Sequence, residues 1–384
     1  MAGLSSISSL LKRATDSGDV PGVAVAVANG NDILFEGAAG TRDRDSGAPM
    51  GVDTVVRIAS MTKAVTGAAA MQLVEQGKLD LDSPIGKLLP DLGAVKVLEG
   101  YDADGKPRLR APKRPVTLRH LLTHTSGHTY DTWNAANGEY REKSGMPAMT
   151  TGKLAALNMP LLFDPGEKWE YGIGIDWAGR AIEEASGLKL DDYMKRNLFE
   201  PLGMADTGFR IGDSQRARLS ALYLRTPTGY TPFDRGRPEK PEFDGGGGLL
   251  STVKDYTRFT QMILRKGTFN GARVLKPETV ELMSQNAMGE VNVTRLPCVV
   301  EHLSNAVEFT AGMKWGLTFM INEKPMATGR SPGSLAWAGL MNSYYWIDPA
   351  KGIAGVYATQ ILPFCDVKSL KLFEEFETAV YKGI

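Results

Sequence analysis

The segment Arg57–Val74, RIASMTKAVTGAAAMQLV, places a lysine at the start of a run with hardly any polar side chain. After Lys63 the residues AVTGAAAMQLV are small and apolar on every side of a helix, whereas a surface helix carries a polar stripe. The pattern therefore predicts a helix that other elements cover all round. An ammonium group in such a place needs hydrogen-bonding partners or loses its charge, so we expect polar groups around Lys63.

Strand patterns lie near both ends of the chain, and helical patterns fill the middle. An amphipathic helix at the N-terminus precedes VAVAVAN and DILFEGAAG, which a turn at Gly30-Asn31 joins as a hairpin. Further patterns predict helices at 118–127, 152–159, 175–187, after a glycine run at 245–248, and at about 366–382, with the strand-like runs SLAWAGLMNSYYWID and GIAGVYATQIL around a turn at 349–352. Strands do not alternate regularly with helices, which favours an α+β fold over a doubly wound parallel sheet. We expect a discontinuous α/β domain of residues 1–90 and 240–384, interrupted by a mainly helical domain of residues 91–239.

Charge and cysteine content exclude several kinds of partner. Lys+Arg and Asp+Glu both number 44, so no global field attracts nucleic acid or an acidic membrane. The two cysteines, Cys298 and Cys365, form neither a disulfide framework nor a zinc motif. We expect no cofactor and no metal, and a small molecule as the partner. The N-terminus lacks a basic head followed by an apolar core, and no apolar run reaches membrane-spanning length, so we expect a cytoplasmic protein.

Three Ser-x-x-Lys quartets show that this spacing alone is a weak signal. The pairs Ser9–Lys12 and Ser251–Lys254 lie on a polar helix face and at a capping pattern, so both are interpreted as structural. Only Ser60 opens an apolar helix, with Lys63 one turn later on the same face. The pair supplies two parts of serine acyl transfer: a hydroxyl, and a group that can accept its proton. An N-cap serine with a solvated lysine explains the residues equally well.

Other candidate nucleophiles and bases are weaker. Gly329–Gly333 matches the G-x-S-x-G elbow of α/β-hydrolases, but Pro332 follows the serine, the next segment is strand-like, and no histidine comes later. Ser331 is therefore interpreted as a loop residue. The four histidines, of which two lie in LLTHTSGHTY, are interpreted as hydrogen-bonded structural residues rather than as bases for Ser60.

The ordered blocks SMTK, GKLDLDSPIGKLLPDL and LRHLLTHTSG resemble the superfamily of penicillin-binding proteins and class C β-lactamases. The chain looks most like the family VIII carboxylesterases and the related statin-forming acyltransferases, particularly over residues 88–110. The resemblance extends from about residue 20 to the C-terminus. It implies a β-lactamase/transpeptidase-like fold, in which helices flank an antiparallel sheet.

The resemblance also implies the remaining catalytic groups. The family has a tyrosine after a Pro-Gly turn, and Tyr171 follows Pro165-Gly166 at the matching distance. A cation beside a phenol favours its deprotonated form, so Tyr171 is expected to take the Ser60 proton and return it to the leaving alcohol. Whether Lys63 or Tyr171 is the formal base stays open. The backbone N–H groups of Ser60 and Leu340 are expected to form the oxyanion hole.

Two positions depart from the β-lactamase pattern. Ile173 stands where those enzymes carry an asparagine, and Trp337 replaces the lysine that holds a substrate carboxylate. A β-lactam loses two polar anchors by these changes, whereas a neutral ester loses none. Trp337 is expected either to form an apolar wall or to pack across strands, and Gly339 to let the substrate approach. Tyr130 and Trp133 are expected at the pocket entrance.

The sequence therefore predicts a serine carboxylesterase for short- to medium-chain esters, with weak β-lactam hydrolysis as a side activity. Acyl transfer to an alcohol, and β-lactamase or D-Ala peptidase activity, are the alternatives of similar chemistry. A non-catalytic binding protein that keeps the fold is the alternative from another class. Asp176 is interpreted as a residue at the positive end of a helix dipole, and Gly245–Gly248 as a close-packed strand or a flexible site border.

Overall fold

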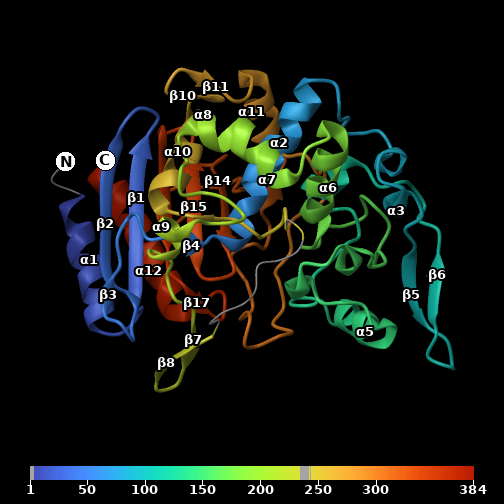
Figure 1. The fold of residues 1–384 in the computed structure, drawn as a ribbon, viewed down its shortest axis with the longest axis horizontal. Helices are drawn as coiled ribbons and strands as arrows, with labels where there is room; N and C mark the ends of the chain where they lie inside the picture. The colour runs from blue at the N-terminus through green and yellow to red at the C-terminus, as the bar shows by residue number, and fades with distance from the viewer. Residues whose placement is uncertain (1–3, 234–241, 243) are drawn as a thin grey trace.

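The computed structural model describes residues 4–233, 242 and 244–384 (Figure 1). Within these residues the largest sheet has eight antiparallel strands. In spatial order they are β12 (Lys314–Trp315), β13 (Met320–Ile321), β14 (Leu335–Gly339), β15 (Ser343–Asp348), β16 (Ile353–Ala358), β1 (Gly22–Asn29), β2 (Ile33–Asp43) and β3 (Ala48–Pro49). The α+β class and the antiparallel sheet flanked by helices are confirmed.

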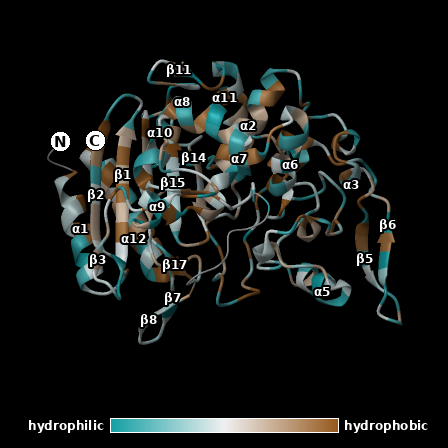
Figure 2. Cartoon of the chain, viewed as in Figure 1, coloured by the Kyte–Doolittle hydropathy of each residue, from teal (hydrophilic) through white to brown (hydrophobic). Residues whose placement is uncertain are grey.

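Helices cover both faces of this sheet. Successive side chains of a strand point to opposite faces. On β15, Tyr344 stacks on Phe373 of α12 (Val367–Gly383), whereas Tyr345 packs against Tyr256 of α10 (Val253–Leu264). The N-terminal helix α1 (Ser5–Asp16) packs on β2 and against α12. Because the sheet is covered on both sides, β1 is buried on both faces and shows hydrophobic colours along its length (Figure 2).

The predicted hairpins are present, with one correction. Strands β1 and β2 pair across the Gly30-Asn31 turn, and β15 and β16 pair across the turn at 349–352. The run SLAWAGLMNSYYWID, however, contains two strands, β14 and β15, which reverse at residues 340–342. Asn342 has φ 56°, a left-handed conformation that asparagine tolerates, and the apolar residues around it mask this turn in the sequence.

The apolar helix predicted after Ser60 is α2 (Thr62–Glu75), entered through the 3₁₀ turn η1 (Ala59–Met61). Every residue from Thr62 to Leu73 is buried, which confirms that the helix is covered all round. On one side it packs against α6 (Gly174–Ser186). At Gly67 a Cβ would lie 2.2 Å from Oγ1 of Thr318, so glycine is needed at this contact.

The chain between these elements forms short helices and small sheets. The helices are α3 (Pro90–Gly93), α4 (Leu118–Leu122), α5 (Ala135–Ser144), α7 (Leu190–Met194), α8 (Glu200–Leu202), α9 (Asp213–Arg216) and α11 (Pro277–Met283). The strands are β4 (Val56–Arg57) with β9 (Leu250–Ser251), β5 (Val97–Tyr101) with β6 (Pro107–Arg110), β17 (Ile361–Leu362) with β7 (Tyr223–Thr226) and β8 (Gly229–Pro232), and β10 (Thr268–Phe269) with β11 (Ala272–Arg273).

Two helix predictions in this region need correction. The helix expected at 118–127 is only α4, because His124 and Gly127 adopt positive φ and end it. The segment 152–159 forms only the 3₁₀ turn η4 (Leu154–Leu157). Elements α3, α5, β5 and β6 lie together at the right of Figure 1, away from β1 and β2. The division into domains stays a prediction, and its boundary at 239/240 lies outside the described residues.

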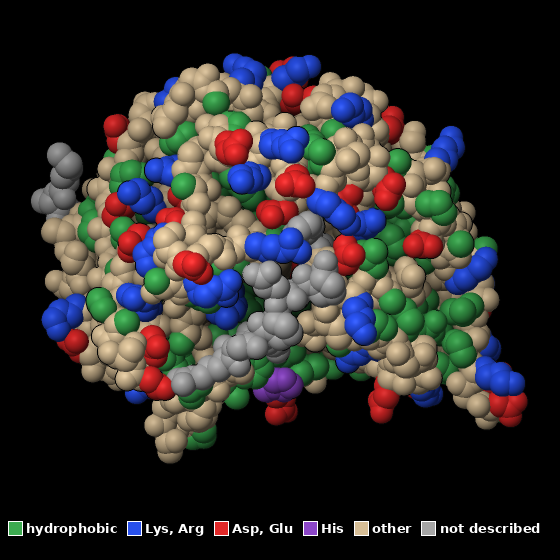
Figure 3. Space-filling view, in the orientation of Figure 1, with side chains coloured by type: hydrophobic (Ala, Val, Ile, Leu, Met, Phe, Trp, Pro, Cys, Tyr) green, Lys and Arg blue, Asp and Glu red, His purple; other side chains and the backbone are tan. Residues whose placement is uncertain are grey.

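Side chains of both charges are interspersed over the face shown in Figure 3. In the described part of the chain, none of the helices is long and apolar enough to cross a membrane. Cys298 is exposed and Cys365 is buried, and neither forms a disulfide.

Candidate active site

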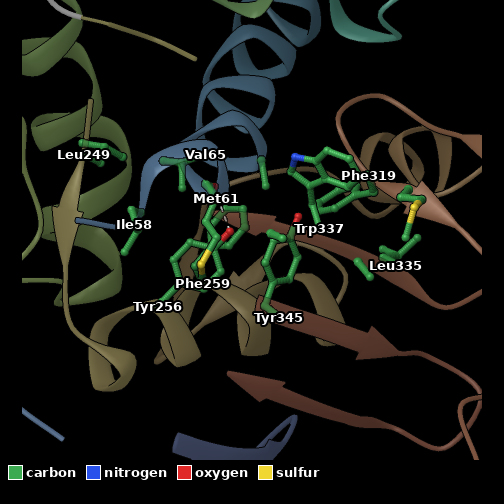
Figure 4. Packing of buried hydrophobic residues seen from close by; sticks show 14 of the residues in the cluster. Ile58, Met61, Val65, Leu249, Tyr256, Phe259, Phe319, Leu335, Trp337 and Tyr345 are labelled. Carbon is green, nitrogen blue, oxygen red and sulfur yellow. Dashed lines mark hydrogen bonds between the residues drawn. The ribbon is translucent and has the colours of Figure 1, made fainter. Parts of the chain in front are cut away.

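Ser60 lies at the point where the chain turns from β4 into α2. Ala59 has φ 43°, a strained left-handed conformation for a residue with a side chain, and it turns the chain sharply just before Ser60. The hydroxyl of Tyr256 donates to the carbonyl of Met61 at 2.9 Å and fixes the turn from below (Figure 4). Ser60 itself remains partly exposed, so its hydroxyl is accessible at the N-terminus of the helix.

Lys63 has no exposed surface and is surrounded by acceptors. Its Nζ donates to Oγ of Ser60 at 3.1 Å, to the hydroxyl of Tyr130 at 3.2 Å and to the carbonyl of Gly246 at 2.6 Å. An ammonium group has three N–H donors, and all three are used. The interpretation of Lys63 as a lysine that reaches solvent is therefore wrong, and Lys63 binds the Ser60 hydroxyl directly.

The carbonyl that binds Lys63 comes from the glycine run. Gly246 donates its N–H to Oδ1 of Asp176 at 2.8 Å, and Gly245 accepts from Oγ1 of Thr66 at 2.6 Å. A Cβ on Gly246 would lie 2.4 Å from Oδ2 of Asp176. The run is thus a close-packed turn against α2 and α6, not a strand, and its backbone binds the lysine.

Tyr130 and Asp176 extend the polar site beyond Lys63. Tyr130 retains some exposed surface, but its hydroxyl points inward and donates to Oδ2 of Asp176 at 3.2 Å. Burial and the neighbouring carboxyl of Asp244 raise the pKa of Asp176 well above its usual range. Burial and the charge of Asp176 likewise raise the pKa of Tyr130 well above the ordinary value, so this phenol stays protonated. Sequence reasoning placed Tyr130 only at the pocket entrance and did not connect Asp176 with Lys63.

Tyr171 lies beside Lys63 within a cluster of aromatic rings. Nζ of Lys63 is 4.7 Å from the centroid of the Tyr171 ring. Among the described residues, the Tyr171 hydroxyl has one hydrogen-bond partner, the indole N–H of Trp337, which donates to it at 2.9 Å. The ring of Trp133 lies 5.3 Å from that of Tyr171, and its indole N–H donates to Ser304 at 3.0 Å. Tyr171 is thus next to the lysine, and its proton-transfer role stays a prediction.

Trp337 packs across strands, one of the two interpretations given to it, and its role as an apolar wall for the substrate stays a prediction. It lies opposite Tyr345 in the register of β14 and β15, and its ring is 4.7 Å from that of Trp315. Figure 4 shows Trp337 and Tyr345 on these strands near Met61 and Val65. Trp337 therefore packs within the core and also orients the Tyr171 phenol.

Gly339 brings the end of β14 against the segment that leads to Ser60. A Cβ at this position would lie 2.3 Å from the carbonyl oxygen of Ile58 and 2.4 Å from Oγ of Ser343. Leu340 follows directly, and the absence of a side chain at residue 339 lets this end of β14 pack closely against the segment before Ser60. An oxyanion hole built from Ser60 and Leu340 N–H groups stays a prediction that depends on this close approach.

We expect Gly339→Ala to lower the free energy of unfolding by about 1–3 kcal/mol, because the added methyl overlaps backbone atoms that are fixed by the sheet. Thermal unfolding measures this loss of stability. Gly138→Ala in α5 is the matched control, since a Cβ there meets only Cβ of Asp131 at 3.8 Å. An unchanged melting temperature in Gly339→Ala would contradict the proposed contact.

The histidines, serine and lysines that were interpreted as structural or solvated residues are not part of the site around Ser60. Burial lowers the pKa of His124 well below its usual value and that of His128 to about 3, so both are neutral. Nδ1 of His124 accepts from the Gly172 N–H at 3.4 Å, a structural role. Ser331 lies in a loop before β14, and Lys12 and Lys254 are exposed. Thr252 caps α10 by accepting from the N–H of Asp255, as predicted.

Known proteins resemble this chain over almost its whole length. Residues 7–371 match the Beta-lactamase family. The chain is 32% identical over 400 residues to ML-236A carboxylate methylbutanoyltransferase of Penicillium citrinum, covering 99% of this chain and 95% of that protein. It is 30% identical over 395 residues to lovastatin esterase of Penicillium rubens, covering 96% of both. Unliganded simvastatin synthase from Aspergillus terreus has a similar fold, with a TM-score of 0.84, 30% identity, and coverage of 99% of this chain and 98% of that one.

Proposed function

The chain belongs to the beta-lactamase family, as its motifs indicated, and we propose that it is a serine carboxylesterase that acts through an acyl-enzyme on Ser60. It is an enzyme with serine hydrolase chemistry, like the acyltransferases and esterases it resembles. The observation that carries the proposal is the 3.1 Å contact between the buried ammonium of Lys63 and the accessible hydroxyl of Ser60. Serine acyl transfer needs an accessible hydroxyl with a lysine side chain in hydrogen-bond contact, and this pair provides both.

In the proposed reaction, Oγ of Ser60 attacks the ester carbonyl while its proton passes to the Lys63–Tyr171 pair. The backbone N–H groups of Ser60 and Leu340 stabilise the oxyanion, a contribution of about 2.7–4 kcal/mol for each such donor. Tyr171 donates a proton to the leaving alcohol, which completes the acyl-enzyme. Water then attacks the acyl group by the reverse path and releases the acid.

Neutral esters with short to medium acyl chains are the proposed substrates. Two buried apolar side chains, Ile173 and Trp337, stand where a β-lactamase needs polar anchors. The rings of Trp133, Trp169 and Trp337 pack around Tyr171, so the surroundings of the proposed proton donor are apolar. The names of two relatives, a methylbutanoyltransferase and a lovastatin esterase, support ester chemistry on a small acyl group. Weak β-lactam hydrolysis remains part of the proposal because the nucleophile would be shared.

Acyl transfer to an alcohol is the second candidate, and the similarity to a methylbutanoyltransferase over 99% of this chain favours it. The same acyl-enzyme serves both reactions, and the acceptor decides between them. Incubation with a butyryl thioester and a panel of alcohols distinguishes the two. Ester formation that exceeds release of free acid would assign the chain to acyl transfer, and free acid alone would assign it to hydrolysis.

We expect an aryl phosphonate to inactivate the enzyme and to leave one covalent adduct, on Ser60. The reagent mimics the tetrahedral intermediate, so only an activated serine beside oxyanion donors reacts quickly. Peptide mapping by mass spectrometry locates the adduct. An adduct on Ser331, or none on any serine, would contradict the proposal.

A further inference from the structure

As an ammonium group with three neighbouring acceptors, Lys63 has no lone pair with which to accept the Ser60 proton. All three of its N–H groups donate to acceptors, one of which is Ser60 itself. The amine has no free lone pair until one of these protons leaves. The hydrogen-bond chain that continues from Lys63 indicates which group accepts this proton.

That chain runs from Lys63 through Tyr130 to a buried carboxyl group. The Tyr130 hydroxyl accepts from Lys63 at 3.2 Å and donates to Oδ2 of Asp176 at 3.2 Å, so a proton can enter at one side and leave at the other. Asp176 is 3% exposed and lies on the inner face of α6. Burial and Asp244, which is hydrogen-bonded to it, raise the pKa of this carboxyl group, so its carboxylate form binds a proton more tightly than an exposed aspartate does.

We propose that Asp176 takes up the Lys63 proton through the Tyr130 hydroxyl and so converts Lys63 into the neutral amine that receives the Ser60 proton. The O–H bond of Tyr130 breaks as an O–H bond forms on Oδ2 of Asp176. An N–H bond of Lys63 breaks as the Tyr130 O–H bond forms again. An ammonium and a carboxylate become an amine and a carboxylic acid, so total charge and proton number are unchanged.

Neither Tyr130 nor Asp176 contacts the substrate in this scheme, so both are positioning residues that act through Lys63. The inference rests on the proposed function, since it concerns how the Ser60 nucleophile is activated. Among the residues that the structure describes, the titratable groups that face the relay are Tyr171 and Asp244, and His124 faces Lys63. Burial keeps His124 neutral by lowering its pKa, so the proton moves between the Lys63 ammonium and the Asp176 carboxylate.

The variant Asp176→Asn separates the proton relay from a purely structural role of Asp176. Asp176 also holds Gly246 in place through its Oδ1 atom, and Asp176→Asn keeps a side-chain oxygen for that N–H. An amide does not accept the relayed proton, however. In the variant the lysine proton must leave to solvent, which becomes easier as the pH rises.

We expect Asp176→Asn to lower kcat for p-nitrophenyl butyrate by about 10²-fold at neutral pH, with KM little changed. The loss should shrink as the pH is raised, because hydroxide can then take the proton that the variant side chain does not accept, whereas the wild-type kcat should vary less over the same range. Tyr130→Phe breaks the same path and should show the same recovery. A loss that is equal at every pH in both variants would overturn the relay and leave a structural role.

The chain contains a matched control outside the site. The Tyr381 hydroxyl donates to Oδ2 of buried Asp348 at 2.9 Å, and Lys351 lies over the Tyr381 ring at 4.6 Å. Asp348→Asn and Tyr381→Phe therefore remove the same groups from a similar Lys-Tyr-Asp arrangement. Neither should change the pH profile of kcat, and a profile altered as in Asp176→Asn would overturn the inference.

The rate of phosphonate labelling separates this inference from the proposed function. Whether wild-type Ser60 is labelled at all tests the proposed nucleophile, and the rate of labelling in the relay variants, relative to the wild type at the same pH, tests the relay. If Ser60 is labelled and Asp176→Asn reacts more slowly at neutral than at high pH, the relay is supported. If Ser60 is labelled and both relay variants react at the wild-type rate, the relay alone is wrong. If Asp176→Asn fails to fold, the pH dependence of kcat and of labelling in Tyr130→Phe tests the relay.

Discussion

Ser60→Ala is expected to lower kcat/KM for p-nitrophenyl butyrate by at least about 10⁴-fold, the largest effect of any single substitution in this chain. The hydroxyl is the proposed bond-forming atom, and within the described residues Lys63 donates to it directly. Loss of the nucleophile removes the covalent path, and only binding and oxyanion stabilisation remain. The same variant should form no phosphonate adduct.

The fold should tolerate this change. Ser60 is partly exposed, and Lys63 keeps Tyr130 and Gly246 as acceptors when the Ser60 hydroxyl is removed. We expect an unfolding temperature close to that of the wild type, so that lost activity reports on chemistry. Ser331→Ala is the control, because Ser331 lies in a loop before β14 and its backbone N–H keeps the contact with Asp348 when the hydroxyl is removed. Full activity in Ser60→Ala, or a comparable loss in Ser331→Ala, would refute the assignment of the nucleophile.

The sequence predicted the elements whose pattern is set by local chemistry. The apolar run of α2, the hairpin at Gly30-Asn31, and α6 ending at Gly187 are all present. The split of β14 from β15 was missed because the turn depends on Asn342, and the hydrogen bonds that hold its side chain come from residues 361 and 363. Such long-range contacts leave no periodic signal in the sequence.

The sequence predicted only the part of the site that lies within a recognisable motif. Spacing along one helix brings Ser60 and Lys63 together, and the structure bears out that contact. Tyr130, Asp176 and Gly246 come from three distant segments, so their meeting at Lys63 depends on tertiary packing. One signal was available: Asp176 stands between Ile175 and Trp177 in an apolar stretch of the chain, where an acid needs an internal partner.

Tyr171→Phe is expected to lower kcat by about 10³-fold, the second largest effect, because the phenol is the proposed proton donor to the leaving alcohol. The ring and its contacts with His124, Trp133 and Trp337 remain. The variant leaves the buried indole N–H of Trp337 without its acceptor, which costs about 1–3 kcal/mol of stability. Kinetics should therefore be compared at a temperature where thermal unfolding shows both proteins to be folded.

Trp337→Phe serves as the control for Tyr171→Phe, because it breaks the same hydrogen bond and leaves the phenol in place. We expect it to lose far less kcat than Tyr171→Phe. The pH profile then distinguishes the two tyrosines: activity lost in Tyr130→Phe should recover at high pH, whereas Tyr171→Phe lacks the proton donor itself and should not recover. A near-normal kcat in Tyr171→Phe would remove this residue from the mechanism. The proton donor to the leaving alcohol would then be sought in Tyr130, whose hydroxyl is hydrogen-bonded to Lys63.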